Sequence, residues 1–254
     1  MQKNYNIYYN LGYWFLLLIL LVLAGFYTSY FSVFFQPKPP IIHIHFTLMA
    51  LWIAMLIVQP FLIKYKKPAI HKMLGKISYV LVPLVLFSGF LMIRLSYYRF
   101  SDDLHQKAAL GLNQFNNDQI LKQAATYQAI ALFWLLIFAL FYSLAVINRR
   151  KSAVHYRYMV AAALSLLGPT VDRIILFGFK LDKLPGSLPI ESAAFFIADT
   201  VLALLLWKDY TNKRPTKTLL TCLLIYLIGQ VFYFTLPGGN VWTNLVTFIM
   251  KPEP

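Results

Sequence analysis

The chain has 254 residues and a formal net charge of +14, and 59% of its residues are hydrophobic while only 13% are charged. Its mean hydropathy is +0.62. A soluble domain is usually about half apolar and a quarter charged, so this composition excludes an ordinary soluble protein. The positive charge then marks membrane topology and favours contact with the lipid bilayer, and we expect no nucleic-acid partner.

Seven apolar runs predict membrane-spanning helices, because each is close to the 20 or so residues that a spanning helix needs and is apolar on every face. They cover residues 11–35, 44–63, 74–95, 126–147, 157–178, 190–207 and 218–236, and an eighth run, 241–250, is too short to span. The first run is too long for a signal peptide and no cleavage site follows it. The predicted fold class is all-α. A single polytopic bundle over 1–254 comprises an additional helix in 1–37, a core bundle in 38–210, and a C-terminal helix and tail in 211–254.

Basic residues gather in alternate connections between these runs. If the N-terminus is inside, the inner connections hold most of the 23 Lys and Arg residues, from Lys3 onward, while Asp209 is their one acidic residue. Short loops rich in Lys and Arg stay in the cytoplasm. We therefore expect a multi-pass inner-membrane protein with a cytoplasmic N-terminus and a periplasmic C-terminus. The outer loop 96–125 is polar and contains good helix formers, which predicts a partly helical cap.

Two inner connections resemble each other, "KKPAIHKML" before the third run and "RKSAVHYRYM" before the fifth. Trp52 lies 19 residues before His71, and Trp134 lies 21 residues before His155. This similarity predicts a parallel repeat of two helical hairpins, 44–95 and 126–178. The third and fifth helices then run in the same direction, so both histidines enter the membrane at one level and can face a shared central volume.

Ionisable groups inside a membrane are costly and mark functional sites by default. Axial ligation of a b-type haem requires two neutral imidazoles that face each other across a bundle axis, which His71 and His155 could supply. Gly75 lies one turn after His71, where a missing side chain would admit a flat macrocycle. The alternative is that His71 and His155 bind lipid phosphate beside Lys72 and Arg157. Histidine pairs that ligate haem also normally sit deeper than these two.

Two further histidines, His43 and His45, follow Pro39–Pro40 at the outer side. In an extended segment both would face one site, whereas in a helix they diverge by about 200°. Asp172 could share a metal with an imidazole, and Arg173 could pair with Asp172 or receive an anion. These residues predict an outward-facing site for zinc or another divalent metal, or for a polar ligand. A structural polar cluster is the alternative, since H-x-H supplies two ligands where zinc takes three or four.

Two residues within the later helices complete the set of polar candidates. Asp199 lies about nine residues inside the sixth run and could relay a proton, bind a ligand or make a buried structural hydrogen bond. The single cysteine, Cys222, cannot form an intrachain disulfide and is expected to fill apolar space.

The chain resembles a family of bacterial multi-pass inner-membrane proteins for which no activity is established. The resemblance covers about 40–210 and rests on "PPIIHIHFTLMALWIAMLIVQPFLI", "HKMLGKISYVLVPLVLFSG", "HYRYMVAAALSLLGPTVDRI" and "IADTVLALLLWKDY". It is also faintly similar to transmembrane di-haem cytochromes of the ascorbate-dependent kind, in which histidines on four consecutive helices hold two haems. The fourth run here contains no histidine. That resemblance therefore implies at most one haem, between His71 and His155.

These observations predict an integral membrane protein that binds a cofactor or polar ligand within its helix bundle. Its most concrete form is a single b-type haem used for electron transfer. The alternatives are a metal-dependent intramembrane hydrolase at the outward-facing His/Asp site, and a carrier or sensor that binds a small ligand without chemistry. The sequence does not decide whether the protein is an enzyme, nor its protein partners.

Overall fold

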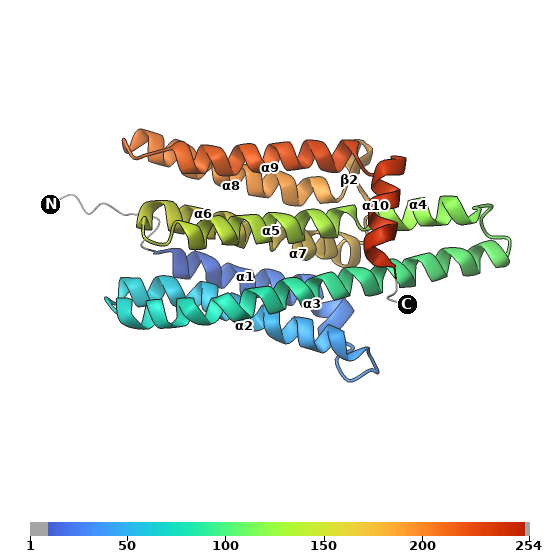
Figure 1. Ribbon diagram of the computed structural model, residues 1–254, viewed down its shortest axis with the longest axis horizontal. Coiled ribbons are helices and arrows are strands. Elements are labelled where there is room, and N and C mark those ends of the chain that lie inside the picture. Colours follow the sequence, from blue (N-terminus) through green and yellow to red (C-terminus); the bar gives the residue numbers. More distant parts are fainter. Residues whose placement is uncertain (1–9, 252–254) are drawn as a thin grey trace.

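Long helices running side by side make up nearly all of the computed structural model, which describes residues 10–251 (Figure 1). Lys3 lies outside the described residues. The main helices are α1 (Leu11–Phe26), α2 (Pro40–Lys64), α3 (Pro68–Ala109), α4 (Asn117–Tyr127), α5 (Ala129–Ile147), α6 (Ser152–Leu164), α7 (Leu167–Arg173), α8 (Glu191–Thr211), α9 (Lys217–Thr235) and α10 (Asn240–Met250). The π-helical turns η2 (Tyr27–Phe31) and η3 (Ile174–Gly178) continue α1 and α7. Between η3 and α8 lie two-residue strands, β1 (Lys183–Leu184) and β2 (Leu188–Pro189), which pair antiparallel around a 3-10 turn, η4 (Pro185–Ser187).

The predicted all-α membrane bundle is confirmed. Six helical segments among the described residues are long and apolar enough to cross a membrane: Leu11–Phe31, Pro40–Lys64, Pro68–Ala109, Asn117–Ile147, Ser152–Gly178 and Lys217–Thr235. The predicted run 190–207 forms α8, which is long enough but carries Glu191, Asp199, Lys208 and Asp209. Those charges set α8 apart from the other six. The short run 241–250 forms α10.

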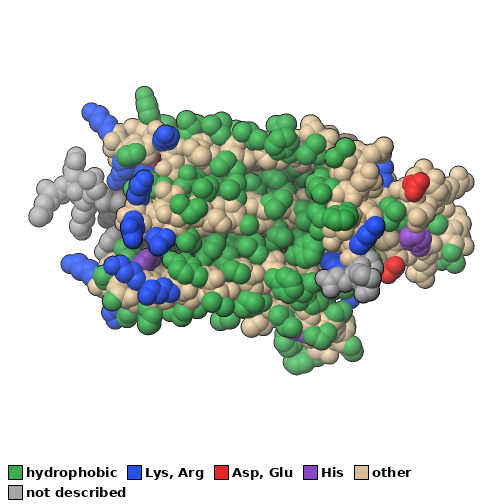
Figure 2. Space-filling view, viewed as in Figure 1, with side chains coloured by type: hydrophobic (Ala, Val, Ile, Leu, Met, Phe, Trp, Pro, Cys, Tyr) green, Lys and Arg blue, Asp and Glu red, His purple; other side chains and the backbone are tan. Residues whose placement is uncertain are grey.

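The two ends of the bundle differ in charge. Figure 2 shows Lys and Arg side chains gathered at one end and green apolar side chains covering the middle. We call the first the basic end; its residues are Lys64, Lys66, Lys67, Arg149, Arg150, Lys151, Lys208, Lys213, Arg214 and Lys217. The other, the opposite end, is where α2 begins at Pro40 and η3 ends at Gly178. An apolar belt between two polar ends is the surface that a bilayer requires.

Helices that are adjacent in the chain form antiparallel hairpins and pack in three tiers. In Figure 1, α8 and α9 lie above α5, α6 and α7, with α1, α2 and α3 below. The most extensive contacts are within the hairpins α2–α3 and α5–α6, and α1 also packs on α2 and α7. A continuous apolar core joins the tiers through fully buried side chains such as Trp52, Phe141, Leu202 and Tyr226. The two predicted hairpins, 44–95 and 126–178, therefore exist as packed units.

Small residues allow the helices to approach closely, as is common where helices associate in lipid. A Cβ atom built on Gly25 of α1 would lie 2.6 Å from the backbone oxygen of Thr170 in α7. One built on Gly168 would overlap the indole of Trp134. Three consecutive alanines in α6, 161–163, are also buried. The crossing of α1 over α7 thus depends on a glycine.

At the opposite end, α3 and α4 extend well beyond the rest of the bundle (Figure 1). With 42 residues, α3 is about 63 Å long, twice the thickness of the hydrocarbon layer. The loop predicted as a partly helical cap is therefore the end of α3 and the whole of α4. Helix α10 crosses the bundle here and packs on α4, and the Trp242 indole donates a hydrogen bond to the Ala125 carbonyl at 2.9 Å.

Replacing Gly25 by alanine should destabilise the bundle by about 1–3 kcal/mol, because the new methyl group meets backbone that cannot move aside without separating α1 from α7. Heating in detergent with a thiol-reactive dye would measure this effect, since the single cysteine, Cys222, is fully buried and reacts only on opening. Gly178→Ala is the matched control, since its Cβ would meet only Ile174 Cγ2, at 3.9 Å. Equal melting temperatures for the two variants would contradict the packing argument.

Candidate functional site

His71 and His155 lie together at the basic end. Each stands in the first turn of a helix that leaves a basic loop, His71 in α3 and His155 in α6. Their ring centroids are 6.4 Å apart, and the ring planes are nearly perpendicular, at 89°. Both side chains are half-buried. The structure thus brings side by side the two imidazoles that the repeat predicted to share one level.

Each ring is fixed by a hydrogen bond to the preceding helix of its own hairpin. His155 Nδ1 donates to the Ala145 carbonyl in α5 at 2.8 Å, and His71 Nδ1 donates to the Gln59 carbonyl in α2 at 3.4 Å. A backbone carbonyl can only accept, so both Nδ1 atoms carry the proton and both Nε2 atoms keep a free lone pair. Neither Nε2 has a hydrogen-bond partner within residues 10–251. Histidines that bind metals are commonly oriented in this way.

A hydrogen-bond acceptor without a described donor lies beside the two histidines. Gln59 Nε2 donates to the His71 carbonyl at 3.2 Å, while Gln59 Oε1 is buried and accepts no hydrogen bond from the described residues. A Cβ on Gly75 would find only Gln59 Nε2 within 4 Å, at 3.9 Å. Packing therefore does not require glycine at this position, and the space beside it is open.

The histidines at the opposite end do not face one site. Pro40 is the first residue of α2, so His43 and His45 are both helical and point in different directions. His43 Nδ1 lies 3.0 Å from the Tyr30 hydroxyl, and His45 Nδ1 lies 2.9 Å from the Ser88 hydroxyl. The helical alternative for this segment is the one that occurs, because proline is well tolerated as the first residue of a helix.

Asp172 and Arg173 also separate, since consecutive helical residues face different neighbours. Arg173 Nη1 donates to the Pro169 carbonyl at 3.0 Å, and its guanidinium lies 4.6 Å from the centre of the Phe26 ring. Asp172 Oδ1 is buried without a described hydrogen-bond partner.

The predicted metal ligands are therefore dispersed. No ion pair joins Asp172 to Arg173 among the described residues. Within the same part of the chain, no group of three or more His, Cys, Asp or Glu side chains is arranged to hold a metal ion. The structure does not assemble His43, His45 and Asp172 into one centre.

Asp199 makes a side-chain contact within the bundle. Gln230 of α9 donates through Nε2 to both carboxylate oxygens of Asp199, at 3.0 Å each. This bond joins α8 to α9. Of the interpretations considered for Asp199, the observed contact is the structural hydrogen bond, and a ligand or proton role stays a prediction.

A buried ion pair between α6 and α8 was not foreseen from the sequence. Arg157 Nε and Nη2 both donate to Asp209 Oδ2, at 2.9 and 2.6 Å, and Arg157 Nη1 donates to the Ala153 carbonyl at 2.6 Å. Arg157 is 2% exposed and Asp209 is fully buried. The signal was present, because Asp209 is the one acidic residue in an otherwise basic set of connections.

Comparisons with known proteins add no assignment for this chain. Neither a protein-family model, nor a curated protein sequence, nor a solved structure matches it.

Replacing Asp209 by alanine should cost about 3–5 kcal/mol of stability, because the Arg157 guanidinium then stays buried without its carboxylate. Thermal unfolding of the detergent-purified protein would measure the loss. Asp103→Ala is the matched control, since Asp103 pairs with Lys107 on an exposed surface, where such a pair contributes about 0–1 kcal/mol. A similar shift in both variants would show that burial does not set the strength of the Arg157–Asp209 pair.

Proposed function

We propose that this protein is a multi-pass protein of the bacterial inner membrane that binds a metal-centred cofactor between His71 and His155. The most concrete form is a single b-type haem that transfers electrons. The observation that supports it is the pair of perpendicular imidazoles, each held through Nδ1 and each with a free Nε2 lone pair.

The rings make an edge-to-face contact, and their spacing also suits a shared metal. Metal–nitrogen bonds are about 2.0–2.1 Å, so two imidazoles on opposite sides of one metal have ring centres about 6.4 Å apart. A direct N–H···N hydrogen bond between the rings would bring their centres to about 5 Å. The observed 6.4 Å matches the first distance and is too long for the hydrogen bond.

The surroundings of the pair also suit such a group. Gln59 Oε1 is a spare acceptor beside it, and the open space at Gly75 leaves room for the edge of a flat ring. Lys72 and Lys151 stand near the two histidines in the chain and would offset the carboxylates that haem carries. When bound, haem would supply one-electron chemistry, while the protein would hold and orient it.

Charge supports the orientation. Lys and Arg gather at one end, and the rule for basic loops supports a cytoplasmic location for that end. Helix α1 starts at this end, and α10 lies at the other. A cytoplasmic N-terminus, a periplasmic C-terminus and a cofactor near the cytoplasmic face follow from this orientation.

The other functions are less well supported. An intramembrane hydrolase would need His43, His45 and Asp172 at one centre, and these side chains make separate contacts. A carrier or sensor that does no chemistry needs no metal. That function would not account for the two free Nε2 atoms of His71 and His155.

A visible absorption spectrum and metal analysis of one detergent-purified sample would test the proposal. After expression with ample haem precursor, we expect a Soret band and one iron per chain, both lost in His71→Ala and in His155→Ala. His105→Ala is the matched control, because His105 lies in the extension of α3, where it contacts Ser101 and Asn117.

Colourless, metal-free protein under those conditions would contradict the cofactor proposal and leave the carrier or sensor. Stoichiometric zinc that is lost in His45→Ala but kept in His71→Ala would instead support the hydrolase.

A further inference from the structure

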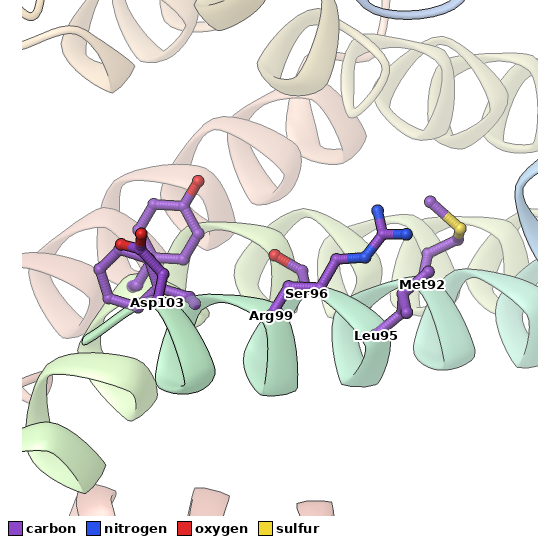
Figure 3. A pocket seen from close by; sticks show the side chains of 7 residues that line it. Met92, Leu95, Ser96, Arg99 and Asp103 are labelled. Atoms are coloured by element: carbon purple, nitrogen blue, oxygen red, sulfur yellow. The ribbon is translucent and has the colours of Figure 1, made fainter. Parts of the chain in front are cut away.

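A cavity of about 320 Å³ opens at the opposite end of the molecule, far from the imidazole pair. Its walls come from α3 and from the last residue of α4 (Figure 3). The lining residues are Met92, Leu95, Ser96, Arg99, Phe100, Asp103 and Tyr127. None of the residues proposed to hold a cofactor takes part in it.

The position of the cavity along α3 places it at the membrane boundary. The contact between His45 and Ser88 shows that the first turns of α2 are level with this part of α3. Met92 is one turn further along α3, close to the level at which α2 begins at Pro40. Asp103 lies eleven residues beyond Met92, about 16 Å along the helix axis. The cavity therefore runs from the edge of the apolar belt into the polar zone outside it.

The chemistry of the lining changes along this path. Met92 and Leu95 form the apolar end, whereas Ser96, Arg99 and Asp103 supply polar groups further out. Figure 3 shows the Arg99 side chain running back along α3 in the direction of Met92. A cationic group therefore stands at the border between the two zones, where the phosphates of a bilayer lie.

No described carboxylate neutralises the charge of the Arg99 guanidinium. Arg99 makes no ion pair with a described carboxylate, and Asp103 pairs instead with Lys107, at 2.7 Å. Tyr127 is held by its stack on Phe100, with ring centres 4.3 Å apart and planes within 10°. The stack orders this wall, and the Arg99 guanidinium favours an anion.

We propose that this cavity binds the phosphate group of a phospholipid from the adjacent leaflet, with Arg99 as the main phosphate contact. The start of the acyl chains would lie along Met92 and Leu95, and the outer part of the headgroup would face Asp103. A phospholipid is favoured over free phosphate because the apolar end of the cavity is continuous with the lipid-facing belt. Guanidinium–phosphate contacts are among the strong, charge-assisted hydrogen bonds.

Native mass spectrometry of the delipidated full-length protein, titrated with phosphatidylglycerol and separately with phosphatidylethanolamine, would test this site. We expect one tight phospholipid per chain, with affinity reduced roughly tenfold or more in Arg99→Gln. Arg94→Gln is the matched control: it removes the same charge from the same helix, but Arg94 contacts the Lys251 carbonyl instead of the cavity. Its tight site should be unchanged.

Two results would overturn the proposal. One is a loss of the tight site that is equal in Arg99→Gln and Arg94→Gln, which would indicate general charge attraction. The other is displacement of the lipid by inorganic phosphate at comparable concentration, which would make free phosphate the ligand. Arg99→Lys keeps the charge but not the forked geometry, so partial retention of affinity in it would support a direct phosphate contact. The absorption spectrum should be the same in all these variants, which separates this site from the cofactor proposal.

Discussion

The depth at which each helix begins determines which side chains can meet inside this bundle. Two histidine hydrogen bonds fix this depth for α3 relative to α2 and for α6 relative to α5. Ala145 lies in the last turn of α5, where backbone carbonyls lack an intrahelical donor. His155 supplies that donor from α6, and His71 reaches the carbonyl of Gln59 from α3 in the other hairpin. Because each imidazole is tied to the preceding helix of its own hairpin, the two rings meet at one depth. The same bonds leave Nε2 free on both.

The two hairpins are similar without being identical, and the difference explains their unequal geometry. Trp52 and Trp134 both lie in the apolar core. The carbonyl that holds His71 is seven residues past Trp52, whereas the one that holds His155 is eleven past Trp134, one helical turn further. His71 thus reaches deeper along its partner helix and makes the longer hydrogen bond. An approximate repeat is enough to place two rings at one level, but it does not give them equivalent environments.

The sequence predicts the helices, their order and the charge asymmetry of the two ends, because length, hydropathy and Lys/Arg placement are local properties. It also places His71 and His155 correctly, since both follow short basic loops whose position is fixed by topology. The directions of the His43 and His45 side chains could not be predicted in this way, because they depend on whether α2 starts before or after these residues. Asp209 was assigned to a loop because α8 continues one turn past the apolar run, so its pairing with Arg157 was missed.

The charges of α8 show how a helix with four ionisable residues fits into this fold. Glu191 lies in the first turn at the opposite end, and Lys208 lies in the last turn at the basic end, so both reach a polar zone. The other two acidic side chains are matched by partners on different helices, Asp199 by Gln230 of α9 and Asp209, beside Lys208 in the last turn, by Arg157 of α6. A buried ion pair adds little net stability over apolar packing, but it is costly to break. Its effect is therefore to allow one register of α8 against α6, since sliding α8 by a turn would separate Asp209 from Arg157. That register also keeps α9 in contact with both helices, and so connects the upper tier to the hairpin that carries His155.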